Sequence, residues 1–283
     1  MRAPAEHAES VLAELLELAP AGLEEVDGDD FVEFAVYGAP GELPELPRGR
    51  AELAGIPVEV TGREVGDDWA DRWREFHKPA QIGQIHVRAP WHDPPSGGID
   101  IVIDPGQAFG TGAHPTTRLC LELLLEVTGG APAEGGPLAA PSPSAVPGPL
   151  ADLGCGSGVL AIAAAKLGFG PIVAVDNERA AVDATVANAR ANAVTIERAE
   201  RHDLRAGPAP VKRVTVANLV RPLLLRVAEG WREAELLPEQ PETLIVSGLL
   251  EGEEDEVATA FAPLRERRRL RLQGWSALLL TRP

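Results

Sequence analysis

The chain has 283 residues, of which 45% are hydrophobic and 24% charged, and its formal net charge is −17. This composition is typical of a folded protein with one large and one smaller domain, and it excludes a disordered tail or a collagen-like chain. No apolar run is long enough to span a bilayer, and the N-terminus lacks the layout of a signal peptide. We therefore expect a cytoplasmic protein that makes no membrane contact.

The net charge and the number of cysteines limit the classes of partner and of bound metal that we expect for this chain. Nucleic-acid binders normally carry a basic patch, so this acidic chain is expected not to bind nucleic acid directly. A negative surface favours encounter with a basic partner, although solubility alone also explains the charge. Cys120 and Cys155 are too few for a disulfide framework and stand outside metal-ligand spacing, so we expect reduced thiols and no metal.

Residues 1–62 are predicted to form a small α+β domain. Within residues 4–18 the apolar side chains that form one helical stripe are Val11, Leu12, Leu15 and Leu16. The alternating segments 31–37 and 56–60 predict strands. Only three residues precede Pro4, which predicts that no well-paired strand comes before the helix. A unit this small is marginal alone, so we expect it to bind a partner or the larger domain.

Residues 63–79 are predicted to link the two parts of the chain. Acidic residues begin the segment, and Trp69, Trp73 and Phe76 follow at helical spacing, which indicates a short amphipathic helix with an aromatic face. Spacing alone equally allows this helix to belong to the core of the larger domain.

Residues 80–283 alternate strands and helices, which predicts an α/β domain with a mostly parallel sheet. The predicted strands are 150–153, 172–175, 214–217, 244–246 and 277–280, and the helices between them include 159–167, 178–191 and 251–264. Segment 129–149 holds six prolines and five glycines in 21 residues, so we predict a flexible surface insertion there.

The strongest local pattern is a glycine turn after the first of these strands. Asp152-Leu-Gly154-Cys-Gly156-Ser-Gly158 leads from an apolar strand into a helix, a layout suited to a nucleotide-type ligand. The dinucleotide fingerprint needs its third glycine at position 159, where this chain has valine. The pattern D-x-G-x-G-x-G instead resembles motif I of class I S-adenosylmethionine-dependent methyltransferases.

Two further polar residues end predicted strands. Asp176 follows the second strand and can accept hydrogen bonds from both hydroxyls of a ribose, or cap the helix that begins near Glu178. Asn218 ends a later strand, at the sheet edge where ligand sites collect, and an amide there can orient an amine. Ending the strand is the alternative role of Asn218.

The loop before the glycine turn makes the resemblance close. The loop and the helix after it read DPGQAFGTGAHPTTRLCLELL. The segment DDWADRWREFHKPAQIG precedes them, and the segments that follow are DLGCGSGVLAIAAAKLG, VDNE, VANL and SGLLEGEEDEV. Together these segments resemble the bacterial enzymes that methylate the eleventh protein of the large ribosomal subunit, the PrmA family. The similarity runs from about Gly22 to the C-terminus.

The resemblance implies a class I methyltransferase domain with a Rossmann-like seven-stranded sheet, and this domain binds S-adenosylmethionine. A small substrate-recognition domain precedes it in the chain. It implies transfer of methyl groups to lysine or N-terminal amines of a basic ribosomal protein by a monomeric enzyme, with Asn218 catalytic. The residues that it places at the cofactor are Phe109, Thr116, Thr117, Gly154, Gly156, Asp176 and Asn218. It gives His114 no role as a general base.

Three features depart from the family. We expect the small domain to lack the family's first strand, either because the chain start is cut short or because the domain has one strand fewer. The 129–149 insertion is longer than the family needs, and Leu-Val-Arg follows Asn218. Enzymes that methylate amide nitrogens or exocyclic amines of bases carry Pro-Pro-Tyr or Pro-Pro-Phe at that point, which counts against such acceptors. The alternatives are a methyltransferase for another basic protein or a small molecule, a nicotinamide-dependent oxidoreductase, a nucleic-acid methyltransferase and a non-catalytic cofactor-binding scaffold.

Overall fold

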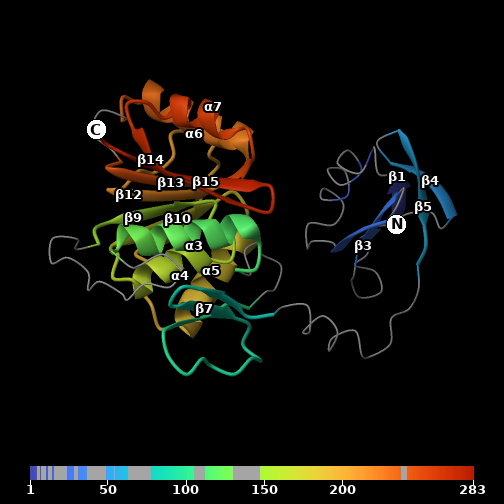
Figure 1. Cartoon of the computed structure of the whole chain (residues 1–283), viewed down its shortest axis with the longest axis horizontal. Helices are drawn as coiled ribbons and strands as arrows, with labels where there is room; N and C mark the ends of the chain where they lie inside the picture. Colours follow the sequence, from blue (N-terminus) through green and yellow to red (C-terminus); the bar gives the residue numbers. More distant parts are fainter. Residues whose placement is uncertain are drawn as a thin grey trace. The chain divides into compact units, whose positions relative to one another are not determined.

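The computed structural model describes residues 1–4, 7, 11, 15, 24–28, 31–36, 49–53, 55–62, 78–104, 112–129, 147–236 and 241–283. The chain divides into two compact units, residues Met1–Arg74 and Glu75–Pro283 (Figure 1). The linker helix predicted at 63–79 lies outside the described residues except for 78–79, and so does most of the predicted insertion, since 130–146 are not described.

The first unit contains a five-stranded antiparallel sheet in the order β2-β3-β1-β5-β4. Its strands are β1 (Arg2–Pro4), β2 (Glu24–Asp27), β3 (Phe31–Ala35), β4 (Gly49–Leu53) and β5 (Ile56–Val60). The prediction that no paired strand precedes the helix is wrong. Three residues suffice because β1 lies between two strands, pairing with β3 along its length and with β5 at Arg2.

The core of this unit comes from a helical stripe and the sheet. Val11 and Leu15 are helical and fully buried, and they belong to one apolar cluster with Phe34 and Val58. The helical stripe was predicted to begin at Pro4, but Pro4 belongs to β1, and Leu12 and Leu16 lie outside the described residues.

The second unit is built on a seven-stranded sheet in the order β11-β10-β9-β12-β13-β15-β14. Its strands are β9 (Leu150–Leu153), β10 (Ile172–Asp176), β11 (Arg198–Arg201), β12 (Val214–Asn218), β13 (Thr243–Leu250), β14 (Arg265–Leu272) and β15 (Trp275–Thr281). Strands β9 to β13 are parallel to one another, while β15 lies between β13 and β14 and runs antiparallel to both. The predicted α/β class with a mostly parallel sheet is confirmed.

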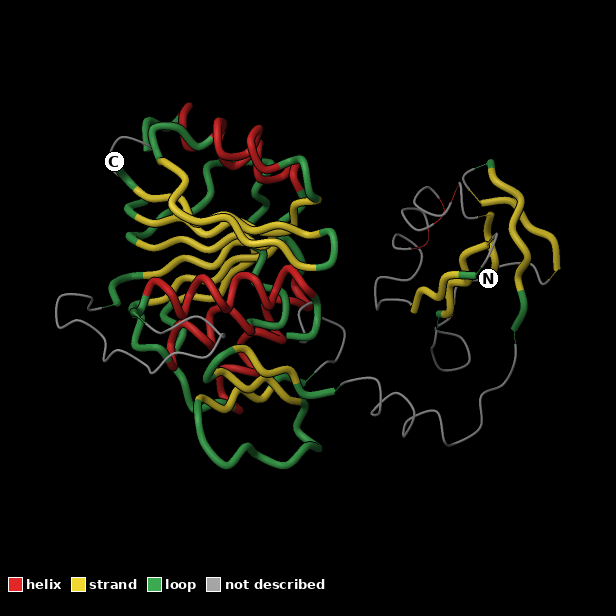
Figure 2. Tube along the Cα trace, in the orientation of Figure 1, coloured by secondary structure: helices red, strands yellow, loops and turns green. Residues whose placement is uncertain are grey.

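Helices cover both faces of this sheet (Figures 1 and 2). On one face lie α3 (Pro115–Val127), α4 (Val159–Lys166) and α5 (Arg179–Ala191), and on the other lie α6 (Arg221–Glu233) and α7 (Glu254–Ala260). Because both faces are covered, the central strands are mostly apolar, and β9 is buried at every position, including Asp152. The helix predicted at 251–264 is shorter: it starts later because Gly252, at φ 102°, is not helical, and it ends at Ala260.

A second, three-stranded sheet packs on the side of the helices α3 and α4. It is formed by β6 (Ala80–Ile82), β7 (Ile85–Arg88) and β8 (Ile99–Val102), with β7 in the middle. Asn192, after α5, joins this sheet to the main layer, since its side-chain amide donates to Val102 O at 2.6 Å and its oxygen accepts from Val102 N–H. Among the described residues no helix is long and apolar enough to cross a membrane.

Candidate active site

The main sheet reverses its strand order between β9 and β12. From β9 the chain builds outward through β10 and β11, and then returns to place β12 and β13 on the other side. The carboxyl ends of all five parallel strands meet at one edge, and a ligand crevice forms where the order reverses. Gly154 follows β9 and Asn218 ends β12, so both lie at this point.

The glycine turn after β9 has a backbone that other residues rarely adopt. Gly154, Gly156 and Gly158 have φ angles of 75°, 51° and 82°. The positive φ of Gly154 favours glycine, and a Cβ at this position would clash with Cδ2 of Leu219, so the Leu219 side chain would have to move. Asp152 holds the turn from below, because its Oδ2 accepts from Ala161 N–H in the first turn of α4 at 3.0 Å.

The Asp176 carboxylate ties two backbone segments together at the end of β10. Its Oδ2 accepts from Gly156 N–H and its Oδ1 from Glu178 N–H, each at 3.0 Å. The N-cap of α5 is Glu178 and no side chain caps this helix, so the bond from Asp176 belongs to the turn before the helix rather than to a cap. Each carboxylate oxygen keeps a lone pair for a further donor, so this contact leaves Asp176 able to accept from hydroxyl groups of a ligand.

Asn218 and Thr117 face each other across the crevice from different elements. The Asn218 side-chain nitrogen lies 3.5 Å from Thr117 Oγ1, and Thr117 is in the first turn of α3. In this orientation the amide oxygen of Asn218 remains to accept a hydrogen bond. The helix start that supplies Thr117 is capped by His114, whose Nδ1 accepts from Thr116 N–H at 3.3 Å.

These residues surround one pocket. Its volume is about 220 Å³, several times the ~30 Å³ occupied by a water molecule, so it admits a small organic molecule. The lining residues are Thr117, Gly154, Cys155, Gly156, Val159, Leu160, Asp176, Asn177, Asp203, Leu204, Arg205, Asn218, Leu219 and Leu223. The glycine cradle beside Leu219, the strand-end carboxylate and the apolar wall fit a nucleoside-bearing cofactor such as S-adenosylmethionine.

Comparison with known proteins agrees with this geometry. The sequence profile of the family described as ribosomal protein L11 methyltransferase (PrmA) matches residues 50–283. Proteins named ribosomal protein L11 methyltransferase from Citrifermentans bemidjiense and Geobacter sp. (strain M21) are each 39% identical to the chain, over 77% of it and 68% of their own length. This chain belongs to the ribosomal protein L11 methyltransferase family.

A solved structure of the family has the same fold. The crystal structure of ribosomal protein L11 methylase from Lactobacillus delbrueckii subsp. bulgaricus is similar with a TM-score of 0.56 and 26% identity, over 72% of this chain and 99% of that chain. The predicted family and the class I methyltransferase fold are thus confirmed. The family profile begins at residue 50, later than the start near Gly22 that we expected.

The structure brings together five of the seven residues predicted at the cofactor. Thr117, Gly154, Gly156, Asp176 and Asn218 all line the pocket. Thr116 is not among the lining residues, because its hydroxyl lies 2.8 Å from His114 Nδ1 beneath the helix start. Phe109 lies outside the described residues. The cofactor roles of all seven remain predictions.

Several lining residues were not predicted. Asp203, Leu204 and Arg205 follow β11, and Asn177 follows Asp176. The strand before Asp203 reads Arg-Ala-Glu-Arg and shows no apolar pattern, so its carboxyl end could not be recognised. Leu219 and Leu223 lie just beyond Asn218, and the rule that ligands gather past strand ends would have found them.

Burial shifts the pKa of the two thiols and of the histidine at the start of α3. Burial raises the pKa of Cys120 and of Cys155, and both thiols are free of disulfides. Burial also lowers the pKa of His114, which keeps the capping ring neutral. No cluster of metal-ligating side chains occurs within the described part of the chain.

Proposed function

We propose that this enzyme transfers methyl groups from S-adenosylmethionine to lysine or N-terminal amines of ribosomal protein L11. One observation carries the proposal: Gly154, Asp176, Thr117 and Asn218 line a single pocket at the point where the sheet reverses its strand order. The relatives named above are ribosomal protein L11 methyltransferases, which supplies the acceptor. Its site of action is the cytoplasm, and it acts as a monomer that does not bind nucleic acid.

The cofactor is held by backbone and strand ends. Gly154 and Gly156 leave room for close approach, Asp176 accepts from the ribose hydroxyls, and Thr117 contacts the methionine part. When bound, S-adenosylmethionine supplies an electrophilic methyl group on a sulfonium. The apolar side chains of Leu219 and Leu223 exclude water from this end of the pocket.

The acceptor must arrive as a neutral amine. A lysine with a pKa of about 10.4 is neutral about once in 2,500 molecules at pH 7, which costs roughly 4–5 kcal/mol. Loss of solvent at the site and a nearby positive charge both favour the neutral form. The amide oxygen of Asn218 then accepts a hydrogen bond from the amine, which directs its lone pair along the line of transfer. Alignment supplies the rest of the acceleration, and no dedicated base is needed.

The acceptor is tested by incubating the protein with labelled S-adenosylmethionine and ribosomal proteins from methylation-deficient cells. The band of ribosomal protein L11 should become labelled. Label in a different protein, or in none, would refute this acceptor.

The role of Asn218 is tested by Asn218→Ala. We expect turnover to fall about a hundredfold, since misplacement of the amine costs that much, while cofactor affinity changes less. The matched control is Asn177→Ala, which removes the same group from the same pocket at the far strand end. It should keep the wild-type kcat at saturating cofactor. Unchanged turnover and cofactor affinity in Asn218→Ala would remove the assignment.

A further inference from the structure

Two large apolar side chains are exposed beside the pocket. Val220 is 61% exposed and Leu250 is 49% exposed, and the part of the chain that the structure describes has no other exposed large hydrophobic side chain. Val220 follows the pocket residues Asn218 and Leu219, while Leu250 ends β13, the parallel neighbour of β12. Both therefore lie at the carboxyl edge of the sheet, which also carries the pocket.

An ion pair connects the chain segments that carry these two residues. Arg221 Nε donates to Glu253 Oε1 at 3.0 Å, and Glu253 Oε2 accepts from Leu250 N–H at 2.9 Å. Glu253 thus connects the residue after Val220 directly to the backbone of Leu250. We call Val220, Arg221, Leu250 and Glu253 the acceptor rim.

The rim continues onto an aromatic pair. Leu250 is the register partner of Trp275 on β15, so both side chains project from the same face of the sheet. The Trp275 ring meets the His114 ring edge-on, with centroids 5.1 Å apart, and His114 caps the helix that supplies Thr117. Apolar surface therefore leads from the rim toward the start of α3.

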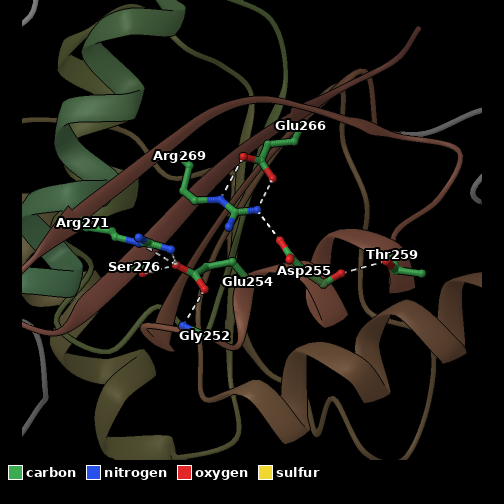
Figure 3. Close-up of polar contacts among 8 residues, drawn as sticks. All are labelled: Gly252, Glu254, Asp255, Thr259, Glu266, Arg269, Arg271 and Ser276. Atoms are coloured by element: carbon green, nitrogen blue, oxygen red, sulfur yellow. Dashed lines mark hydrogen bonds and ion pairs between the residues drawn. The ribbon is translucent and has the colours of Figure 1, made fainter.

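A buried carboxylate, that of Glu254, holds the turn that follows Leu250, and Figure 3 shows its contacts. Glu254, only 1% exposed, accepts from Gly252 N–H at 2.6 Å and from the Ser276 hydroxyl and Arg271 Nε, each at 2.8 Å. These bonds join the turn after Leu250 to β14 and β15. A fixed exposed apolar side chain is suited to binding, because little ordering entropy is lost when a partner covers it.

The charge around the rim favours a cationic partner. Arg221 is already paired with the two carboxylates of Glu253 and Glu256, and the exposed Glu251 directly follows Leu250. A lysine-bearing segment suits this surface, because its aliphatic carbons can cover Val220 and Leu250 while neighbouring cations face the carboxylates.

We propose that the acceptor rim is the docking surface for the segment of ribosomal protein L11 that carries the acceptor amine. This inference rests on the proposed function. Val220 and Leu250 contact the segment on either side of the amine and set its direction toward Asn218. The rim determines the affinity for the protein acceptor and leaves the affinity for the cofactor unchanged.

The test is the double variant Val220→Ser with Leu250→Ser in the full chain. Loss of two apolar contacts should raise KM for ribosomal protein L11 about tenfold, with kcat and the Kd for S-adenosylmethionine within about twofold of wild type. Val220→Ile with Leu250→Met should restore the wild-type KM. The matched control is Ile196→Ser, a partly buried apolar residue between α5 and β11 at the opposite edge of the sheet, which should leave KM unchanged.

Each outcome of this test either supports or overturns the proposed docking surface. A wild-type KM in a folded double variant overturns the rim, while the proposed function stands if the wild type still methylates ribosomal protein L11. Failure of the wild type overturns both. A change of molar mass in solution would assign the surface to a second copy of the chain and also overturn the inference. If the double variant does not fold, Val220→Ser alone serves, because serine is favoured at that helix N-cap.

Discussion

Gly154 shows how one residue without a side chain connects two strand ends. Its φ of 75° disfavours other residues, and an added Cβ would meet the Leu219 side chain at 2.4 Å. Leu219 itself lines the pocket and precedes Val220. This contact therefore links the glycine turn after β9 to the residues that follow β12.

Gly154→Ala should weaken binding of S-adenosylmethionine at least tenfold, as measured by calorimetric titration. The strain of about 1–3 kcal/mol must be relieved by moving either the turn or Leu219, and both line the pocket. Gly207→Ala is the control, since nothing lies within 4 Å of the added Cβ there. Equal cofactor affinity in the two variants would contradict the role of the contact.

Asp152 should give the stability a pH dependence of unusual sign. The residue is fully buried, and burial raises its pKa to about 7 against the opposing hydrogen bond from Ala161, with Asp176 adding to the rise. In the unfolded chain an aspartate titrates near 3.9. Between these two pH values the side chain is ionised in the unfolded chain but protonated in the folded protein. The contribution of Asp152 to the free energy of unfolding therefore falls as the pH rises from about 4 to about 7.

Asp152→Asn should remove that slope. Urea denaturation at pH 5 and pH 8 should show that the variant loses less stability on going to pH 8, by more than about 1 kcal/mol. Asp183→Asn, at a carboxylate that is 61% exposed, should keep the wild-type difference. A wild-type difference in Asp152→Asn would show that the carboxyl group ionises freely in the folded protein.

At the scale of elements, strands with a continuous apolar pattern could be predicted from the sequence, and strands without one could not. The central strands β9, β10 and β12 were found because they are buried on both faces, and their ends located Gly154, Asp176 and Asn218. The edge strand β14 reads Arg-Glu-Arg-Arg-Arg-Leu-Arg-Leu and was not predicted. Its pairing with β15 places it in the sheet, and this long-range contact has no local signature.

The short helix α7 is attached to the sheet through Glu254. Burial alone would raise the pKa of this carboxyl group, but bonds from backbone N–H groups, Arg271 and Ser276 outweigh burial and lower the pKa to about 2. Because the folded pKa lies below the unfolded value, the stabilisation is complete above about pH 5 and is lost as the pH falls toward 2.

Glu254→Gln should lower the free energy of unfolding at pH 7 by about 2 kcal/mol, since it weakens charge-assisted hydrogen bonds. The loss should shrink in urea denaturation at pH 3, where the wild type is also losing the charge. Glu229→Gln, in an exposed pair with Arg226, should change stability by less than about 0.5 kcal/mol. If Glu254→Gln had equally small effects, the buried network would contribute nothing measurable.

At the scale of the whole molecule, each unit has its own core. Val11, Leu15, Phe34 and Val58 form a cluster within the first unit, and the clusters on the two faces of the large sheet contain only residues from 80 onward. All the described residues that line the pocket belong to the second unit. We therefore predict that cofactor binding does not require the first unit and propose that the first unit recruits the protein acceptor.

Deletion of residues 1–62 should leave the Kd for S-adenosylmethionine unchanged within about twofold and reduce methylation of ribosomal protein L11 at least a hundredfold. Calorimetric titration and a labelled-methyl assay measure the two quantities. The full chain under the same conditions is the reference. Equal methylation rates with and without these residues would contradict the recruiting role.

The two outer strands of the seven-stranded sheet have a consequence for behaviour at high concentration. Within the described residues, β11 and β14 each pair with a strand on one side only, and an open strand edge is a template for the strand of another molecule. Arginine and glutamate occupy most positions of both strands, and most of these side chains are exposed or half-buried. An incoming strand would have to strip water from these charges, so the sheet blocks fibril-like growth at both of its open edges.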